Sequence, residues 1–398
     1  FSTGSPPADS IQINFKPQTM GNTSKREVRP DVSNSRLPRF TWQSLLFISA
    51  LFITLFQGCA KDGNTDDLLL SPTAKLGGGT SGTGTGTGGS LIKNAFLQTN
   101  LVADVADYHP NIIDPYLINA WGVALGPTGA FWISSADREL SVIYDDSGQP
   151  LRKPVTMEGD PTGQVYNNTA GFVIPGGGPA KFIFATEYGT ITAWESGDVA
   201  TTIIDSTAFG ASYTGLEIAS DGQNTYLFVA NLGQGRIDVF DQNWAYVTTK
   251  PFIDVTLPVG AKPFNVRQID GSMYVTYEAP AGSAINVFDM NGNFMRRFAE
   301  GPYLRSPWGI TKTPMGFGLG GAFLVGNFGD GRINIITPTG GYKGSLVGND
   351  GRPIVIDGLW ALIFEDDAFT GAGDPDLYFT AGPAGETHGL FGEISPAH

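Results

Sequence analysis

Acidic and amide side chains recur at one position of a repeated pattern in this chain. Each of them directly follows a short apolar run, and together they are Asp137, Glu187, Asn231, Glu278 and Asn327. Two further amides, Asn119 and Asn265, stand at the start of other apolar runs. Carboxylate and amide oxygens are the hard ligands that calcium prefers. If the fold gathers these residues around one axis, they form a candidate site for a cation or a polar ligand.

Other groups able to do chemistry are few. The chain has three histidines, His109, His388 and His398, and a single cysteine, Cys59. It has no G-x-S-x-G motif, so a serine nucleophile of the hydrolase type is not indicated. His109 and His388 lie near opposite ends of the predicted folded region, and closure of a ring would bring them close. Two interpretations therefore stand for this pair: a shared ligand or acid/base role, or structural roles.

Six sequence repeats supply the elements that would position these residues. The two most similar copies are LFVANLGQGRIDVFD at 227–241 and FLVGNFGDGRINIIT at 323–337, which share Asn, Gly, Arg and Ile in one register. Looser copies complete a set that starts at 121, 162, 214, 264, 308 and 360, at intervals of 41 to 52 residues. Such intervals are typical of propeller blades, and the short β-branched and aromatic runs between turn residues predict strands.

The repeats predict an all-β fold, a six-bladed β-propeller with four-stranded blades. The segment 96–104, FLQTNLVAD, reads as a strand before the first repeat, and we expect it to close the ring by pairing with the last blade. Loops that enter the innermost strand and loops that leave the second strand open on the same face. The acidic and amide residues should therefore converge on the central channel. Trp121, Trp308 and Trp360 occupy matching places in innermost strands, which favours packing between blades over a stacking platform for sugars.

The first 93 residues are predicted to lie outside the folded body, which should occupy residues 94–398. Basic residues precede an apolar run at 45–56 that ends just before Cys59, which predicts an N-terminal extension and a lipoprotein-type signal peptide over residues 1–58. The position of Cys59 resembles a bacterial lipobox, in which the cysteine carries the lipid; an uncleaved anchor helix and a buried helix are the alternatives. Residues 59–93 are acidic and Gly/Thr-rich, which predicts a flexible tether.

The net charge of the chain limits the classes of partner that we expect. A formal charge of −14 at pH 7 leaves no basic stripe to neutralise phosphates, so nucleic acid is not an expected partner. A protein, a glycan or a small molecule remains possible. We expect contact with a membrane only through the N-terminal lipid, and a monomeric body in the bacterial cell envelope, in the periplasm or at the outer membrane.

Several motifs together resemble one known family. They are Asn119-Ala-Trp-Gly-Val, Pro307-Trp-Gly-Ile, Val325-Gly-Asn-Phe-Gly-Asp-Gly-Arg-Ile, Gly358-Leu-Trp-Ala-Leu, Leu377-Tyr-Phe-Thr-Ala-Gly and His388-Gly-Leu-Phe-Gly. The chain is similar to an uncharacterised family of exported bacterial six-bladed propellers, NHL-like or SMP-30-like in shape. The resemblance implies fold and export but no reaction. The candidate channel site also resembles, in type and place, the metal site of SMP-30-like hydrolases, although no residue-level motif of those enzymes carries over.

Two functions from different classes fit these observations. The first is an exported, lipid-tethered binding or scaffold protein that uses one face of the channel. The alternative is a calcium-dependent hydrolase or lactonase, in which a channel cation would polarise an ester carbonyl. In that case Glu187 or Glu278 would have to serve as the base. The sequence does not decide whether the protein is an enzyme.

Overall fold

The structure is a computed structural model that describes residues 95–365 and 376–397. The chain divides into two units, Phe1–Gly77 and Gly78–His398, and the described residues belong to the second. The predicted signal peptide, Cys59, the tether, Asn94 and His398 lie outside the described residues. Within the described ranges, no helix combines the length and the apolar character needed to cross a bilayer.

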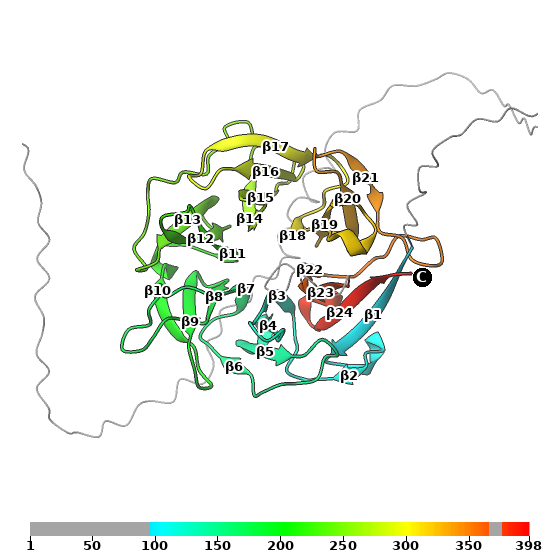
Figure 1. Cartoon of the computed structure of the whole chain (residues 1–398), viewed down its shortest axis with the longest axis horizontal. Coiled ribbons are helices and arrows are strands. Elements are labelled where there is room, and N and C mark those ends of the chain that lie inside the picture. The colour runs from blue at the N-terminus through cyan, green and yellow to red at the C-terminus, as the bar shows by residue number, and fades with distance from the viewer. Residues whose placement is uncertain (1–94, 366–375, 398) are drawn as a thin grey trace, which may run out of the picture. The chain divides into compact units, whose positions relative to one another are not determined.

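Six antiparallel sheets stand around a central axis as the blades of a propeller (Figure 1). In each blade the strand nearest the axis comes first in the chain or, in blade six, follows the closing strand. Blade one consists of β3 Ala120–Leu125, β4 Phe131–Ser135, β5 Leu140–Tyr144 and β6 Val155–Thr156. Blade two consists of β7 Pro161–Tyr166, β8 Phe182–Thr186, β9 Thr190–Trp194 and β10 Thr201–Asp205. Blade three consists of β11 Tyr213–Ser220, β12 Thr225–Asn231 and β13 Arg236–Asp241.

Blades four to six continue the pattern around the ring. Blade four consists of β14 Lys262–Ile269, β15 Ser272–Glu278, β16 Ala284–Phe288 and β17 Phe294–Glu300. Blade five consists of β18 Pro307–Lys312, β19 Phe323–Asn327, β20 Ile333–Ile336 and β21 Tyr342–Ser345. Blade six consists of β22 Leu359–Phe364, β23 Leu377–Ala381, β24 Leu390–Pro396, β1 Phe96–Ala103 and β2 Ile112–Ile113. Every innermost strand begins within two residues of its predicted start. The predicted six-bladed propeller is confirmed.

Blade three differs from the others because its ladder holds three strands. The place of a fourth strand is taken by the segment around Tyr246, which forms an isolated bridge with Phe240. Blade six has five strands, because the two-residue β2 adds to β1 in parallel. Short helical turns occupy some loops, namely η1 Ala106–Tyr108, η2 Ala136–Arg138, η3 Thr207–Phe209, η4 Met315–Phe317 and α2 Pro383–Glu386.

Strand β1 closes the ring as the sequence predicts. It pairs antiparallel with β24, from Phe96 opposite Pro396 to Ala103 opposite Leu390. Just beyond β1, Asp104 accepts hydrogen bonds from the Gly389 backbone N–H at 3.0 Å and from the His388 ring at 2.8 Å. The closing strand is therefore fixed to blade six by side-chain as well as backbone contacts.

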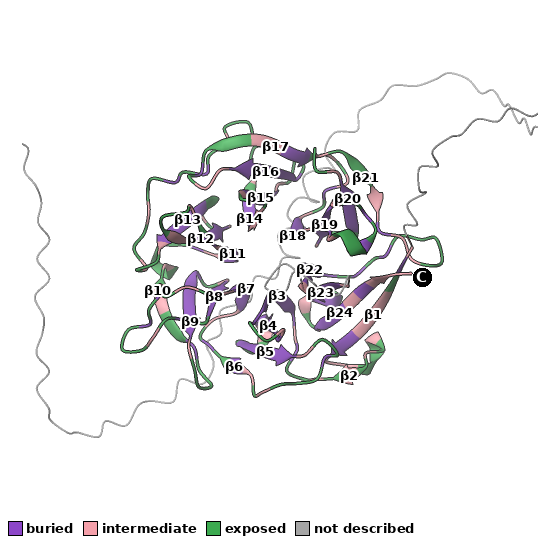
Figure 2. Ribbon diagram, viewed as in Figure 1, coloured by how far each residue is buried: buried purple, intermediate pink, exposed green. Residues whose placement is uncertain are grey.

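Packing is tightest where the innermost strands meet. Strands β3 and β22 are buried along their whole length, whereas the outer strand β10 is largely exposed (Figure 2). A β-carbon placed on Gly122 would lie 2.8 Å from the Cα of Gly163, and one on Gly309 would lie 2.7 Å from the carbonyl oxygen of Trp360. Glycine at these places lets neighbouring innermost strands approach more closely than a side chain permits.

Two faces result from this topology. We call the face on which the innermost strands begin the N-face, and the face on which they end the C-face. Loops that leave the second strand of a blade also open on the N-face, and the hairpin turns between first and second strands open on the C-face.

Candidate functional site

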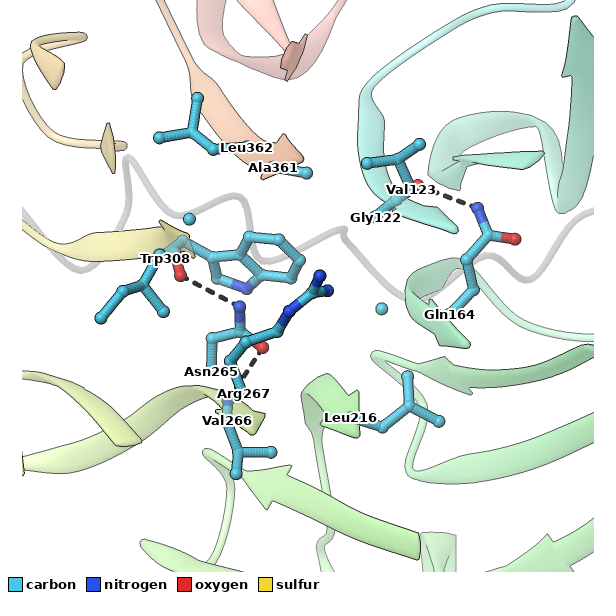
Figure 3. Close-up of a pocket in the computed structure, with 13 residues that line it drawn as sticks. Gly122, Val123, Gln164, Leu216, Asn265, Val266, Arg267, Trp308, Ala361 and Leu362 are labelled. Carbon is cyan, nitrogen blue, oxygen red and sulfur yellow. Dashed lines mark hydrogen bonds between the residues drawn. The ribbon is translucent and has the colours of Figure 1, made fainter. Parts of the chain in front are cut away.

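Three successive positions in each innermost strand surround the axis. The first position holds Trp121, Thr162, Thr214, Phe264, Trp308 and Trp360. The second holds Gly122, Gly163, Gly215, Asn265, Gly309 and Ala361. Most residues of the second and third positions line a cavity of about 20 Å³ together with Trp308 and Arg267 (Figure 3). That volume accommodates about one water molecule, so the middle of the channel is nearly filled.

Aromatic rings close the channel on the N-face side of this cavity. We define the aromatic plug as Trp121, Phe264, Trp308, Phe328 and Trp360. Trp360 lies between two stacked rings, with centroid distances of 3.8 Å to Trp121 and 4.1 Å to Phe328. Phe264 and Trp308 meet Trp360 edge-on at 5.8 and 6.0 Å. Offset-stacked and edge-on pairs are the favourable arrangements for aromatic rings, so the plug is a well-packed element.

Hydrogen bonds fix two of the three indole rings. Trp308 Nε1 donates across the axis to the carbonyl oxygen of Thr214 at 2.9 Å, and Trp360 Nε1 donates to Asn119 Oδ1 at 3.1 Å. The buried Nε1 of Trp121 finds no hydrogen-bond partner among the described residues. All three tryptophans are buried, which confirms the predicted packing role and adds that they pack on one another across adjoining blades.

Three acidic residues from adjacent blades, Asp137, Glu187 and Glu386, interact on the N-face. We call the place where they meet the N-face mouth. Glu386 lies at the end of α2 in blade six, with a left-handed backbone (φ 70°). Burial, and then the negative charges of Glu187 and Asp137, raise the pKa of Glu386 to about 8. One of its carboxyl oxygens is buried and has no hydrogen-bond partner in the part of the chain that the structure describes. A carboxyl group in this setting holds its proton at neutral pH.

Glu278 is a second carboxyl group with an altered proton affinity. It ends β15, and its strand partner is Lys262 at the start of β14. Burial raises the pKa of Glu278 to about 7, although the positive charge of Lys262 acts in the opposite direction. Glu278 therefore titrates near neutral pH, and it does so in blade four, outside the group formed by Asp137, Glu187 and Glu386.

The predicted amide residues mainly hold the backbone. Asn231 Oδ1 accepts from the N–H groups of Ser212 and Gln234, at 3.3 and 3.0 Å, and its amide donates to Asp238 at 2.7 Å. The amide of Asn327 donates to the carbonyl oxygen of Tyr303 at 2.8 Å. Asn231 is thus committed to its own loop.

Asn327, Asn119 and Asn265 have distinct surroundings. Asn327 Oδ1 is buried without a partner among residues 95–365 and 376–397, so it retains one free acceptor. Asn119, with φ 49°, accepts the Trp360 indole N–H. Asn265 Nδ2 donates to the carbonyl oxygen of Trp308 at 3.0 Å, and its Oδ1 accepts the Val266 N–H at 2.9 Å. Asn119 and Asn265 therefore support the plug and the channel wall.

The two histidines are not joined by any hydrogen bond or ring contact in the structure. His388 Nδ1 lies 2.8 Å from Asp104 Oδ2, and the His388 ring meets Tyr108 edge-on at 5.8 Å. His109 follows Tyr108 as the left-handed cap of η1, and it is exposed. Ring closure thus brings the two segments together, but it pairs His388 with Asp104.

The donor set was compared with the needs of a calcium ion. In the described ranges, no three His, Cys, Asp or Glu side chains are grouped closely enough to hold a metal ion. Of the predicted metal candidates, Glu187 and Glu278 lie in blades two and four, and Asn231 already uses its acceptor oxygen. Asn327 keeps one acceptor without a partner among the described residues. Calcium takes six to eight oxygen ligands, and a calcium ion in the channel stays a prediction.

No model of a known protein family matches the chain. Two uncharacterized proteins of Acanthamoeba polyphaga mimivirus are each 30% identical to it, over 318 and 312 residues. The matches cover 71% of this chain and 81% and 76% of the two relatives. The chain therefore belongs to the same family as these mimivirus proteins. Because the relatives are viral, they give no support to the predicted bacterial source or to export.

Solved structures with a similar shape include propeller enzymes. A putative gluconolactonase is 16% identical with a TM-score of 0.47, over 70% of this chain and 89% of its own. A gluconolactonase from Xanthomonas campestris is 13% identical with a TM-score of 0.47, over 70% and 86%. A luciferin-regenerating enzyme is 13% identical with a TM-score of 0.48, over 71% and 92%. At these identities the likeness says nothing about the reaction or ligand of this chain.

Glu386 is the residue that sequence reasoning missed. It belongs to the blade-six loop that corresponds to the loops of Asp137 and Glu187, but it stands five residues after the end of β23 at Ala381. The available signal was the motif Ala381-Gly-Pro-Ala-Gly-Glu386, an acidic residue in a Gly/Pro turn at the matching place of the repeat.

Proposed function

We propose that the protein is a binding protein whose N-face mouth takes a ligand with a cationic group, such as a small amine or a basic side chain. The observation that carries the proposal is the group Asp137, Glu187 and Glu386, in which burial, and then the negative charges of Glu187 and Asp137, raise the pKa of Glu386 to about 8. A cation at this place would be attracted by the charges of Glu187 and Asp137 and would favour ionisation of Glu386.

An aromatic surface on the N-face supports the same ligand class. Phe328 is the member of the aromatic plug that retains partial exposure, and it stacks on the buried Trp360. Ammonium and guanidinium groups bind favourably over aromatic faces, and more so where water is excluded. The formal charge of −14 also favours the approach of a cation.

Binding is favoured over catalysis by the state of the reactive groups. The imidazole of His388 is paired with Asp104. The plug beneath the mouth is fixed by the hydrogen bonds of Trp308 and Trp360. The described side chains at the mouth thus offer charge and an aromatic surface, without a nucleophile activated by a neighbouring base.

Calorimetry with putrescine, choline and N-acetylarginine amide tests the proposal. Binding of a cation should lower the pKa of Glu386, so titrations at pH 7 in buffers of different ionisation enthalpy should reveal proton release. Glu386→Gln should abolish that release, and Glu187→Gln should weaken binding about tenfold. Asp146→Asn, which removes one exposed charge from a C-face turn, is the matched control. Equal affinity for neutral analogues would overturn the proposal.

A calcium-dependent hydrolase or lactonase is the second candidate. It is favoured by Glu386 and Glu278, because carboxyl groups with pKa values of about 8 and 7 are able to exchange protons at neutral pH. Elemental analysis of the dialysed protein, beside a Glu187→Gln/Glu278→Gln double variant, tests for calcium. A lactone and ester screen tests for turnover. Stoichiometric calcium that the double variant lacks, together with turnover, would replace the binding proposal.

We also propose that Cys59 carries a lipid that tethers a monomeric body to a membrane of the cell envelope. The support is the lone cysteine directly after an apolar run and before an acidic, Gly/Thr-rich stretch. Metabolic labelling with an alkyne fatty acid in a bacterial host should mark the full chain and leave Cys59→Ala unmarked. Labelling of both forms, or of neither, would reject the anchor.

A further inference from the structure

A larger cavity opens on the C-face, away from the acidic mouth. Its volume is about 700 Å³, within the usual range for small-ligand sites. It lies between the innermost strands and hairpin loops of blades four and five, and Phe364 of blade six contributes to its wall. Arg267 lines both this cavity and the narrow channel cavity. We call it the C-face pocket.

Its charged residues are predominantly basic. Arg267, Asp270 and Lys312 are its charged lining residues. Lys312 Nζ lies 2.6 Å from Asp270 Oδ2, and both side chains remain open to solvent, at 36% and 63% exposure. Arg267 Nε lies 3.6 Å from Glu217 Oε2 in β11, and its guanidinium extends into the channel space in Figure 3. Two cations and one acid thus line the pocket, and each cation also has an acidic neighbour, Asp270 or Glu217.

The remaining wall is apolar. Met315, 86% exposed, stands at the rim in η4, and the buried Phe364 lies in the wall. Ile269, Pro314 and Pro338 complete this side. An apolar wall facing a cationic one suits a ligand with one anionic end and a hydrocarbon body.

We propose that the C-face pocket binds a small amphipathic organic anion, a carboxylate on an apolar chain or ring. The carboxylate lies at the Arg267 and Lys312 side. The apolar body lies against Ile269 and Pro338 and beneath Met315. This proposal is independent of the N-face proposal, since the two sites share no residue.

Displacement of a fluorescent anion tests it. The probe is 8-anilinonaphthalene-1-sulfonate, followed by its fluorescence on the folded chain, with sodium octanoate as competitor and octylamine as the cation of equal length. We expect octanoate to displace the probe and octylamine to fail. Calorimetry with octanoate alone should give a one-to-one stoichiometry.

Substitutions then locate the site. Lys312→Gln should weaken octanoate binding about tenfold, because a charged hydrogen-bond partner is lost. Met315→Glu should weaken binding and Met315→Lys should tighten it, each about threefold, since the exposed rim position changes only the local charge. Lys343→Gln, on the exposed outer strand of the same blade, is the matched control.

The Met315 pair keeps the proposal falsifiable even if a pocket variant misfolds, because its side chain is largely in solvent. Equal octanoate affinity in Met315→Glu, Met315→Lys and the parent protein would overturn the proposal. So would displacement of the probe by octylamine at the same concentration as octanoate.

Discussion

The two faces of the propeller hold their charged groups in different ways. On the N-face, Glu386 and Glu278 are partly buried, and their pKa values are raised to about 8 and 7. On the C-face, Lys312 and Asp270 form an ion pair in which both side chains are exposed to solvent. Protonation of the N-face carboxyl groups is therefore coupled to folding, whereas the C-face charges are held in place at little cost.

The two faces should therefore differ in how strongly their charged groups are coupled to the stability of the fold. The N-face mouth stands on the aromatic plug, so changes there should affect the whole fold. The C-face pocket is built from hairpin loops, so its charges should be removable with the fold intact. Four predictions test this difference, in order of expected effect.

Removal of the central ring of the plug should have the largest effect. Trp360→Ala empties a site that is 0% exposed and in contact with four other aromatic rings. We expect a loss of about 3–5 kcal/mol in the free energy of unfolding, measured by urea denaturation. Phe209→Ala, at a side chain that is 74% exposed, should change it by less than about 0.5 kcal/mol. A similarly small loss for Trp360→Ala would show that the plug does not brace the N-face.

The second prediction concerns the pH dependence caused by Glu386. Its pKa is 4.5 in the unfolded reference and about 8 in the folded protein, so the folded state retains the proton more firmly. The stabilisation is fully present below pH 4.5 and is lost as the pH rises through 8, with a slope of up to about 1.4 kcal/mol per pH unit.

Glu386→Gln keeps the shape and removes the titration. Urea midpoints at pH 5, 7 and 9 should therefore decline less steeply in this variant than in the parent protein. Asp146→Asn should leave the parent slope unchanged. Identical slopes in the parent and in Glu386→Gln would mean that Glu386 is not held protonated.

Glu278 should make the free energy of unfolding depend on pH in the same direction as Glu386 does, but by a smaller amount. Its folded pKa of about 7 lies closer to the reference value of 4.5, so its contribution is lost by pH 7 and changes little above it. NMR of carboxyl-labelled glutamate should show two resonances titrating near pH 7 and pH 8. Glu278→Gln should remove the lower one. Titration of all glutamates below pH 5 would refute both assignments.

The smallest effect is expected on the C-face. Lys312→Gln breaks an exposed ion pair and should lower the free energy of unfolding by less than about 0.5 kcal/mol. The urea midpoint at low and at 0.5 M salt measures it. A loss above about 2 kcal/mol would show that the C-face is as tightly coupled to the fold as the N-face, and the contrast between them would fail.

The sequence predicts the fold well because the repeats are explicit. The aligned first positions, from Trp121 to Trp360, mark every innermost strand, and FLQTNLVAD closes the ring as expected. Blade three escapes the prediction of four strands because its outer segment meets β13 only through the Phe240–Tyr246 bridge.

The candidate site is predicted only in part. Asp137 and Glu187 act electrostatically on Glu386, but Glu386 stands at a different offset from its strand, so alignment of the repeats does not reveal it. In the sequence the amides resemble metal ligands. In the structure Asn119 accepts a hydrogen bond from the Trp360 indole, and Asn231 accepts one from the Gln234 backbone N–H of its own turn. The C-face pocket forms where strands and loops of blades four, five and six meet, and only the folded ring brings these segments together.

The aromatic plug has one more consequence. Because the plug and a cavity of about 20 Å³ occupy the middle of the channel, the acidic group on the N-face and the C-face pocket lie on opposite sides of packed aromatic rings. Coupling between the two sites would require the plug itself to shift. Two unlike partners, one cationic and one anionic, could then be held at the same time on opposite sides of a single chain.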